Sequence, residues 1–134
     1  MNSKNVGDIS LSFVIARYLQ KSQPVSIPFG DNQRYDLVVE SAPNKFSRVQ
    51  VKTARLQNNG ERLAFETCSS YCHRGGKKHG YAGDVDVFAV YSPDLNKVYV
   101  IPVDAIGTKE GILRLTPPKN GQAKGIRLAV DYEF

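Results

Sequence analysis

The sequence predicts an α/β fold in which one helix precedes a series of β-strands. Apolar residues near the N-terminus recur at helical spacing, and the runs that follow are short, alternating or β-branched, and bounded by turn residues. At 134 residues with 41% hydrophobic side chains, the chain has the size at which one core buries enough surface to fold alone. We therefore expect a single domain over residues 1–134.

The first element is expected to be an amphipathic helix over residues 8–21. Asp8 lies near its start and Pro24 shortly after its end, which are typical helix boundary signals. Its apolar side chains, at mixed three- and four-residue spacings, are Ile9, Phe13, Ala16 and Leu19.

Six strand-like runs follow this helix. In chain order they are 25–27, 35–40, 46–54, 62–68, 85–91 and 97–103. The sequence Asn-Asn-Gly predicts the turn before the fourth run, and SPDLN predicts the turn before the last. A short helical turn is expected from Pro102 or Asp104 to Gly107, and residues 69–83, with four glycines and no periodicity, are expected to form a long functional loop. The segments ILRL and IRLAV near the C-terminus indicate either a strand pair or an oligomer-forming tail.

The charge distribution predicts an anionic partner. The net charge is +5 with a pI near 9.3, which is compatible with nucleic acid or a membrane surface. Residues 45–81 hold eight basic and two acidic side chains, a net +6, whereas residues 82–110 carry a net −3. No stretch reaches the ~18 apolar residues of a membrane span, and no signal peptide precedes the helix, so we expect a cytoplasmic protein that does not bind membranes.

Three polar residues on neighbouring predicted strands form a candidate site. Asp36 lies on the second run, and Gln50 and Lys52 share one face of the third because side chains two apart point the same way. Metal-assisted phosphodiester hydrolysis needs this combination, since Mg²⁺ prefers oxygen ligands and an ammonium stabilises developing negative charge. A solvated cross-strand ion pair is the simpler interpretation, and spacing alone favours it.

The residues around this site resemble the PD-(D/E)XK nuclease motif. Asp36 in GDNQRYDLVVE takes the place of the first acid, and Gln50-Val51-Lys52 in RVQVKTAR takes the (D/E)XK place. The longer strings FGDNQRYDLVVE, RVQVKTARL, FETCSSYCHRG, YAGDVDVFAVY and KVYVIPVD are similar to PD-(D/E)XK endonucleases associated with group I introns, over roughly residues 5–106.

The resemblance implies a fold and an activity. The fold is a restriction-endonuclease-like core, a mixed β-sheet flanked by helices in the order α-β-β-β followed by further strands. The activity is Mg²⁺-dependent cleavage of double-stranded DNA at a long site, with Mn²⁺ able to substitute, and its role is intron homing. Asp36 and Gln50 would hold the metal, and Lys52 would position water or stabilise the pentavalent phosphate.

Two positions depart from the family pattern. Gln50 replaces the second acid and offers a neutral carbonyl oxygen. Leu11 occupies the place in the first helix where relatives carry a glutamate, and leucine cannot bind a metal. Fewer charged ligands predict weaker Mg²⁺ binding, because a hard cation relies on charged oxygens to replace its water shell. We expect either an inactivated variant or one in which Asp8 substitutes.

The basic residues around the site are expected to bind DNA. Arg34, Arg48 and Arg55 flank the catalytic strands and are predicted to contact phosphates, with surface ion pairs as the alternative. In the glycine-rich loop the DNA-binding candidates are Ser69, Ser70, Tyr71, His73, Arg74, Lys77 and Lys78, with a merely solvated basic loop as the alternative. Asp84 and Asp86 are interpreted as caps or partners of nearby arginines.

The same segment contains possible zinc ligands, but their spacing argues against a zinc site. Cys68, Cys72, His73 and His79 supply four suitable ligand types. Adjacent Cys72 and His73 seldom reach one tetrahedral ion together, and no second Cys-x₂-Cys motif supports them. The cysteines are too few for a disulfide scaffold, and thiols are expected.

One active centre cuts one strand, so double-strand cleavage predicts a homo-oligomer, a dimer at least and plausibly a tetramer. The alternatives are a catalytically impaired DNA-binding subunit, which Leu11 and Gln50 motivate, and a Holliday junction resolvase of the same fold.

Overall fold

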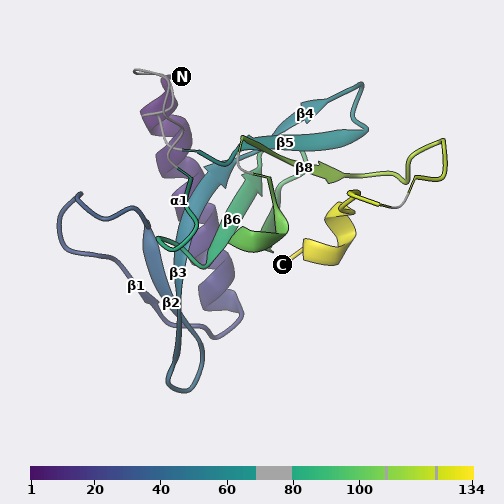
Figure 1. The fold of residues 1–134 in the computed structure, drawn as a ribbon. Coiled ribbons are helices and arrows are strands. Elements are labelled where there is room, and N and C mark those ends of the chain that lie inside the picture. Colours follow the sequence, from purple (N-terminus) through teal and green to yellow (C-terminus); the bar gives the residue numbers. More distant parts are fainter. Residues whose placement is uncertain (69–79, 108, 123) are drawn as a thin grey trace.

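In a computed structural model, which describes residues 1–68, 80–107, 109–122 and 124–134, one α-helix lies against a five-stranded sheet (Figure 1). The sheet order is β1-β2-β3-β6-β7, and a second sheet has the order β4-β5-β8. The elements are α1 (Ser3–Gln20), β1 (Val25–Ser26), β2 (Leu37–Ala42), β3 (Lys45–Thr53), β4 (Arg55–Gln57), β5 (Arg62–Glu66), β6 (Val87–Ser92), β7 (Lys97–Pro102), η2 (Val103–Ala105), β8 (Glu110–Arg114) and η3 (Ala129–Tyr132). Strands β3 and β6 pair in parallel and the other pairs are antiparallel, so the main sheet is mixed, as expected.

Helix α1 begins earlier than the sequence pattern predicts. Asn2 is the N-cap, and its side-chain oxygen accepts a hydrogen bond of 2.9 Å from the backbone N–H of Asn5. The pattern pointed to Asp8 because Asp8 directly precedes the first apolar residue of the repeat. The residues of the first turn before Val6 are all polar, so the spacing of apolar side chains could not reveal this turn.

The predicted apolar stripe of α1 is wrong. Ile9, Phe13 and Leu19 are 39%, 43% and 57% exposed, whereas the buried positions are Ser10, Val14 and Tyr18. Both sets of residues have helical spacing. The buried set includes the hydroxyl-bearing residues Ser10 and Tyr18, so it does not stand out as apolar in the sequence. Ser10 can lie against the sheet because its Oγ shares a hydrogen bond of 2.5 Å with Oγ1 of Thr53 on β3.

The main sheet has an apolar cluster on each face. The helix-side cluster lies between α1 and the sheet and consists of Val14, Tyr18, Leu37, Val39, Val49, Ala89, Tyr91 and Val98. The second sheet, η2 and η3 cover the opposite face. This small-sheet cluster consists of Ala54, Leu63, Phe65, Tyr81, Val85, Phe88, Val90, Tyr99, Ile101, Ile106, Leu113 and Ala129. The edge contact of Phe65 with Phe88, 5.9 Å between ring centroids, joins the two sheets.

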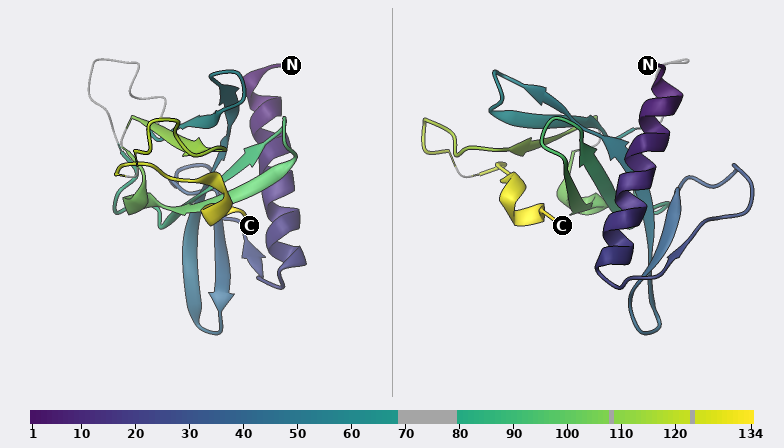
Figure 2. Two further views of the ribbon diagram at one scale, coloured as in Figure 1. Left: turned by 90° about the vertical axis from the view of Figure 1, so that its right-hand side faces the viewer. Right: turned by 180° about the vertical axis from the view of Figure 1, so that it is seen from behind.

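Strands β2 and β3 form a hairpin whose end projects away from the rest of the molecule in all three views (Figures 1 and 2). Leu37 pairs with Val49, and the pairing continues toward the turn at 42–45. Asn44 has φ +63°, the left-handed conformation that a tight hairpin turn requires. The catalytic candidates lie at the other end of this hairpin, next to the centre of the sheet.

The C-terminal segment differs from the strand pair considered from the sequence. The run ILRL belongs to β8 and pairs with β5, whereas IRLAV contributes only one bridge, from Leu128 to Arg114, before the short helix η3. The fourth predicted strand also ends early, at Glu66, and Arg55–Gln57 forms an additional strand against it. In the part of the chain that the structure describes, no helix is both long and apolar enough to cross a membrane.

Candidate active site

Asp36 is fixed to β3 at the point where β2 begins. Its backbone N–H donates to the carbonyl oxygen of Val49 at 2.8 Å, and its Oδ2 accepts from the backbone N–H of Val51 at 2.9 Å. Pairing of β2 with β3 ends at Leu37 and Val49, so no β2 residue lies opposite Val51. The carboxylate therefore supplies the acceptor that the strand would otherwise lack.

Gln50 and Lys52 lie on the face of β3 opposite α1. Val49 and Val51 pack in or against the helix-side cluster, and alternate side chains of a strand point to opposite faces. Gln50 pairs across the parallel ladder with Phe88 of the small-sheet cluster. Among the described residues, Oε1 of Gln50 is buried and has no hydrogen-bond partner. A buried amide oxygen without a partner costs free energy, about 1–3 kcal/mol, which a bound cation would recover.

Burial raises the pKa of Asp36 above its ordinary value of 3.8. The hydrogen bond from Val51 and the charge of Lys52 act in the opposite direction but are the smaller effects. The carboxylate is thus held in an environment that disfavours its charge. A nearby cation such as a divalent metal would relieve this cost.

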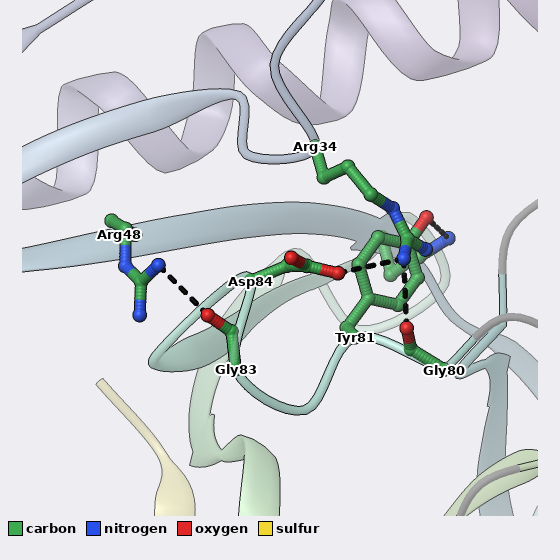
Figure 3. A network of polar contacts seen from close by, with 7 residues as sticks. Arg34, Arg48, Gly80, Tyr81, Gly83 and Asp84 are labelled. Atoms are coloured by element: carbon green, nitrogen blue, oxygen red, sulfur yellow. Dashed lines mark hydrogen bonds and ion pairs between the residues drawn. The ribbon is translucent and has the colours of Figure 1, made fainter.

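Lys52 contacts Tyr81, a buried residue of the turn before β6. Its Nζ lies 3.3 Å from the Tyr81 hydroxyl and 4.9 Å from the ring centroid. The guanidinium of Arg34 stacks on the same ring at 4.2 Å (Figure 3). Nη1 of Arg34 also donates to the carbonyl of Gly80 and to Oδ2 of Asp84, each at 2.8 Å. One network thus joins the loop before β2, the turn at 80–84 and Lys52.

Arg48, which shares a face with Gln50 and Lys52, pairs with Asp86. The Asp86 carboxylate accepts from Nε of Arg48 at 3.2 Å, from Nη2 at 3.3 Å and from the backbone N–H at 2.7 Å. Nη1 of Arg48 donates to the Gly83 carbonyl at 3.0 Å (Figure 3). These hydrogen bonds lower the pKa of Asp86. The interpretation of Asp84 and Asp86 as partners of arginines is confirmed.

The remaining DNA-binding candidates divide into two groups. Nη2 of Arg55 forms an exposed ion pair of 3.1 Å with Glu110, so the three arginines near the site all contact acidic side chains. Such exposed pairs contribute little stability, and phosphates can compete for the arginines. The candidates Ser69, Ser70, Tyr71, His73, Arg74, Lys77 and Lys78 lie outside the described residues, as do Cys72 and His79 of the disfavoured zinc set. Cys68 is buried.

Leu11 does not lie on the same face of the sheet as Gln50 and Lys52. Its side chain is half-buried and packs against the helix-side cluster. Asp8, the suggested substitute acid, is exposed on α1. A cavity of about 440 Å³ opens between the first turns of α1 and the end of β3, and its lining consists of Ser3, Val6, Gly7, Val51, Lys52, Thr53, Arg55 and Glu66. The helix thus approaches Lys52 through its first two turns.

Tyr81 and Glu66 are the residues near Lys52 that the sequence did not single out. Tyr81 follows a glycine in an aperiodic segment, and no spacing rule connects position 81 with position 52. Glu66 ends a strand like many exposed acids, and its approach to Lys52 depends on the packing of β5 beside the end of β3. Only long-range contacts bring these residues to the site.

The oxygen atoms at the site fit a divalent metal in part. Asp36 offers one half-buried carboxylate, and Gln50 offers one buried oxygen that has no hydrogen-bond partner in the described part of the chain; both are of the hard type that Mg²⁺ and Mn²⁺ prefer. Within residues 1–68, 80–107, 109–122 and 124–134, no group of three His, Cys, Asp or Glu side chains is arranged to hold a metal. The two candidate ligands, Asp36 and Gln50, therefore carry a single negative charge between them, which is little for a divalent metal.

The helix, the mixed sheet and the position of Asp36, Gln50 and Lys52 define a restriction-endonuclease-like protein. A family profile described as PD-(D/E)XK endonuclease matches residues 1–134, and the chain belongs to this family. Its fold is similar to that of a bacterial homing endonuclease, I-Ssp6803I, with a TM-score of 0.74 and 25% sequence identity over 99% of this chain and 89% of that one. No curated protein sequence matches significantly. The family and this likeness identify the chain as a DNA endonuclease.

Proposed function

We propose that this chain makes site-specific double-strand breaks in DNA by metal-dependent phosphodiester hydrolysis and that its biological role is intron homing. The observation that carries the proposal is the buried Oε1 of Gln50, which has no hydrogen-bond partner among the described residues and lies one strand position from the Val51 N–H that holds the Asp36 carboxylate. The likeness to a homing endonuclease and the resemblance to nucleases of group I introns support the choice of substrate and role.

Each of the three residues has a distinct part in the proposal. Asp36 and Gln50 would hold Mg²⁺ or Mn²⁺, and the bound ion would supply positive charge to the scissile phosphate. Lys52 directs its ammonium to the same phosphate, where it orients water or stabilises negative charge in the transition state. Arg34, Arg48 and Arg55 hold the flanking phosphates, and the basic loop extends the contact along the duplex.

A double-strand break requires two active centres, so we propose a homodimer at least, with a tetramer as the form that spans a long site. Exposed apolar side chains on the loop after β1 and on the β2–β3 hairpin support self-association. Ile27 and Phe46 are 66% and 63% exposed, and Phe29 is fully exposed.

Leu11 favours a second candidate, a DNA-binding subunit with an impaired site. In relatives, as the resemblance implies, a glutamate at this position completes the metal site. Here the position contributes to an apolar cluster. A subunit of this kind binds duplex DNA and cleaves it slowly or not at all.

Cleavage of three substrates by the full chain tests these candidates. A plasmid library with randomised inserts, a duplex oligonucleotide and a four-way junction are each incubated with Mg²⁺, Mn²⁺ or EDTA, beside a Lys52→Met control. The proposal predicts metal-dependent linearisation of a defined subset of plasmids, which sequencing of the ends identifies. A preference for the junction would indicate a resolvase, and tight duplex binding without cleavage would indicate the impaired subunit.

A further inference from the structure

Tyr81 is held in place from several directions. Its ring is 6% exposed and meets Phe88 edge-on, with 5.6 Å between centroids. The Arg34 guanidinium covers the ring, and Arg34 is itself fixed by Gly80 and Asp84 (Figure 3). The Tyr81 carbonyl accepts from the backbone N–H groups of Asp84 at 2.9 Å and Val85 at 3.1 Å. Few rotations remain for this side chain, so its hydroxyl occupies a defined point.

The side chain of Lys52, in contrast to that of Tyr81, is intrinsically flexible. It is half-buried on a flexible four-carbon stem, and immobilising such a side chain costs up to about 2 kcal/mol of rotamer entropy. Its described polar side-chain contacts are the Tyr81 hydroxyl at 3.3 Å and the Tyr81 ring at 4.9 Å. The hydroxyl accepts from the ammonium, which has donors to spare for a second group.

We propose that Tyr81 is a positioning residue that acts through Lys52: its buried hydroxyl and ring fix the ammonium where the scissile phosphate is bound. This inference rests on the proposed function, since it assigns Lys52 to the reaction. A catalytic group displaced by about 1 Å loses much of its effect, because transition-state stabilisation depends on preorganised geometry. The anchor lies in the turn at 80–84, outside the two strands that carry Asp36, Gln50 and Lys52.

The same network also holds two positively charged side chains close to each other. Arg34 and Lys52 are two cations on one tyrosine ring, and their mutual repulsion is offset by the ring and, at Arg34, by Asp84. Arg34 therefore stabilises the ring that holds Lys52. The loop before β2, where Asp36 begins the site, and the turn before β6 are fixed by the same contacts.

Tyr81→Phe is the variant that tests the inference, because it deletes the hydroxyl and retains the ring contacts with Arg34 and Phe88. Tyr18→Phe is the matched control: Tyr18 is a buried tyrosine of the helix-side cluster, on the other face of the sheet. The measurements are the single-turnover cleavage rate, DNA affinity, Tm, and the rate at which acetic anhydride modifies Lys52 relative to Lys97, followed by mass spectrometry.

For Tyr81→Phe we expect a roughly tenfold to hundredfold lower cleavage rate, as for loss of a hydrogen bond to a charged group. DNA affinity and Tm stay unchanged, and Lys52 is modified several-fold faster while Lys97 is not. Tyr18→Phe leaves the cleavage rate and both modification rates unchanged.

An unchanged cleavage rate in Tyr81→Phe, beside a Lys52→Met variant that is inactive, overturns the inference alone. Unchanged modification of Lys52 also overturns it, since the ammonium is then not held by the hydroxyl. If Lys52→Met cleaves as fast as the original chain, the role given to Lys52 fails. If the original chain cleaves no DNA, the modification rates still decide whether Tyr81 fixes Lys52.

Discussion

Gln50 is the residue whose chemistry best distinguishes this site from an ordinary strand surface. It lies between a buried and a half-buried valine that face α1, and its own side chain points into the opposite layer. Glutamine in such a place normally finds a partner, because a buried amide without one is costly. In the described structure its oxygen has none. The arrangement suits the neutral metal ligand that we propose, and the register of β3 places Gln50 there.

Asp36→Asn tests the acid in two ways. We expect cleavage to fall by about a hundredfold or more, since loss of the charged ligand removes several kcal/mol of metal-assisted stabilisation. We also expect higher stability at neutral pH. The pKa of Asp36 is higher in the folded chain than its ordinary 3.8, so ionisation opposes folding as the pH rises through the folded value. Below pH 3.8 both states are protonated and the gain disappears.

Thermal unfolding between pH 3 and pH 8 measures this gain without metal. Asn can still accept from the Val51 N–H, so the backbone contact is preserved. Asp31→Asn, at an exposed position of the same loop, is the control and should leave Tm and cleavage unchanged. A Tm difference for Asp36→Asn that is the same at pH 3 and pH 8 would contradict the argument from burial.

Leu11→Glu tests the position that differs from relatives. We expect no faster cleavage, because the side chain at position 11 packs against the helix-side cluster, across the sheet from Gln50 and Lys52, where a carboxylate does not join them at a metal. We also expect a loss of about 1–2 kcal/mol in the free energy of unfolding, because Leu11 packs against an apolar cluster. Leu19→Glu, at an exposed position of the same helix, controls for charge. At least about tenfold faster cleavage by Leu11→Glu would contradict this expectation and show that a carboxylate at position 11 strengthens metal binding, as the resemblance implies.

At the scale of elements, β3 determines the position of the site. One of its edges pairs with β2 and the other with β6, and its two faces contact different apolar clusters. Arg48 and Asp86 lock its start to the turn before β6, and Ser10 holds its end against α1. A strand with partners on every side has little freedom to slide. The backbone positions of Gln50 and Lys52 are fixed for this reason.

The second sheet depends on a close contact that Gly111→Ala would break. A Cβ at position 111 would overlap the ring of Phe65 on the neighbouring strand, and that ring is fully buried. We expect a loss of about 1–3 kcal/mol in the free energy of unfolding, as for other overpacked cores. Urea denaturation measures it. Gly107→Ala, where the nearest neighbour is 3.5 Å away and φ is ordinary, should change stability by less than about 0.5 kcal/mol.

At the scale of the whole molecule, the charge is unevenly distributed. The net +5 comes from a basic stretch that includes β3 and residues 69–79 of the sequence, while the following segment is acidic. In the described part of the chain, several of these acids contact arginines at the edge of the site. The acidic segment therefore forms ion pairs with arginines beside the site.

DNA affinity should depend steeply on salt, and the basic loop should account for part of the dependence. Replacing Arg74 and Lys77 together with alanine is expected to reduce the slope of log K against log salt by about 2, since each phosphate contact releases about 0.9 counterions. Fluorescence anisotropy between 50 and 300 mM salt measures the slopes. Alanine at Lys119 and Lys124, exposed but outside the basic stretch, should have the smaller effect. Equal slopes for all three proteins would mean that the loop is merely solvated.

The sequence by itself predicted the first helix and most of the strands that follow it, and the family resemblance added the mixed sheet, the family and the site candidates Asp36, Gln50 and Lys52. Strand periodicity placed Gln50 and Lys52 on one face of a strand, and the resemblance to the nuclease motif, rather than spacing, singled them out together with Asp36. Several arrangements are compatible with the same local sequence pattern, and only the tertiary structure shows which of them forms. It shows which stripe of α1 is buried and which arginine pairs with which acid. It also shows that Tyr81 contacts Lys52. These depend on packing between segments far apart in the chain, where volume and hydrogen-bond satisfaction select one arrangement among several with the same local pattern.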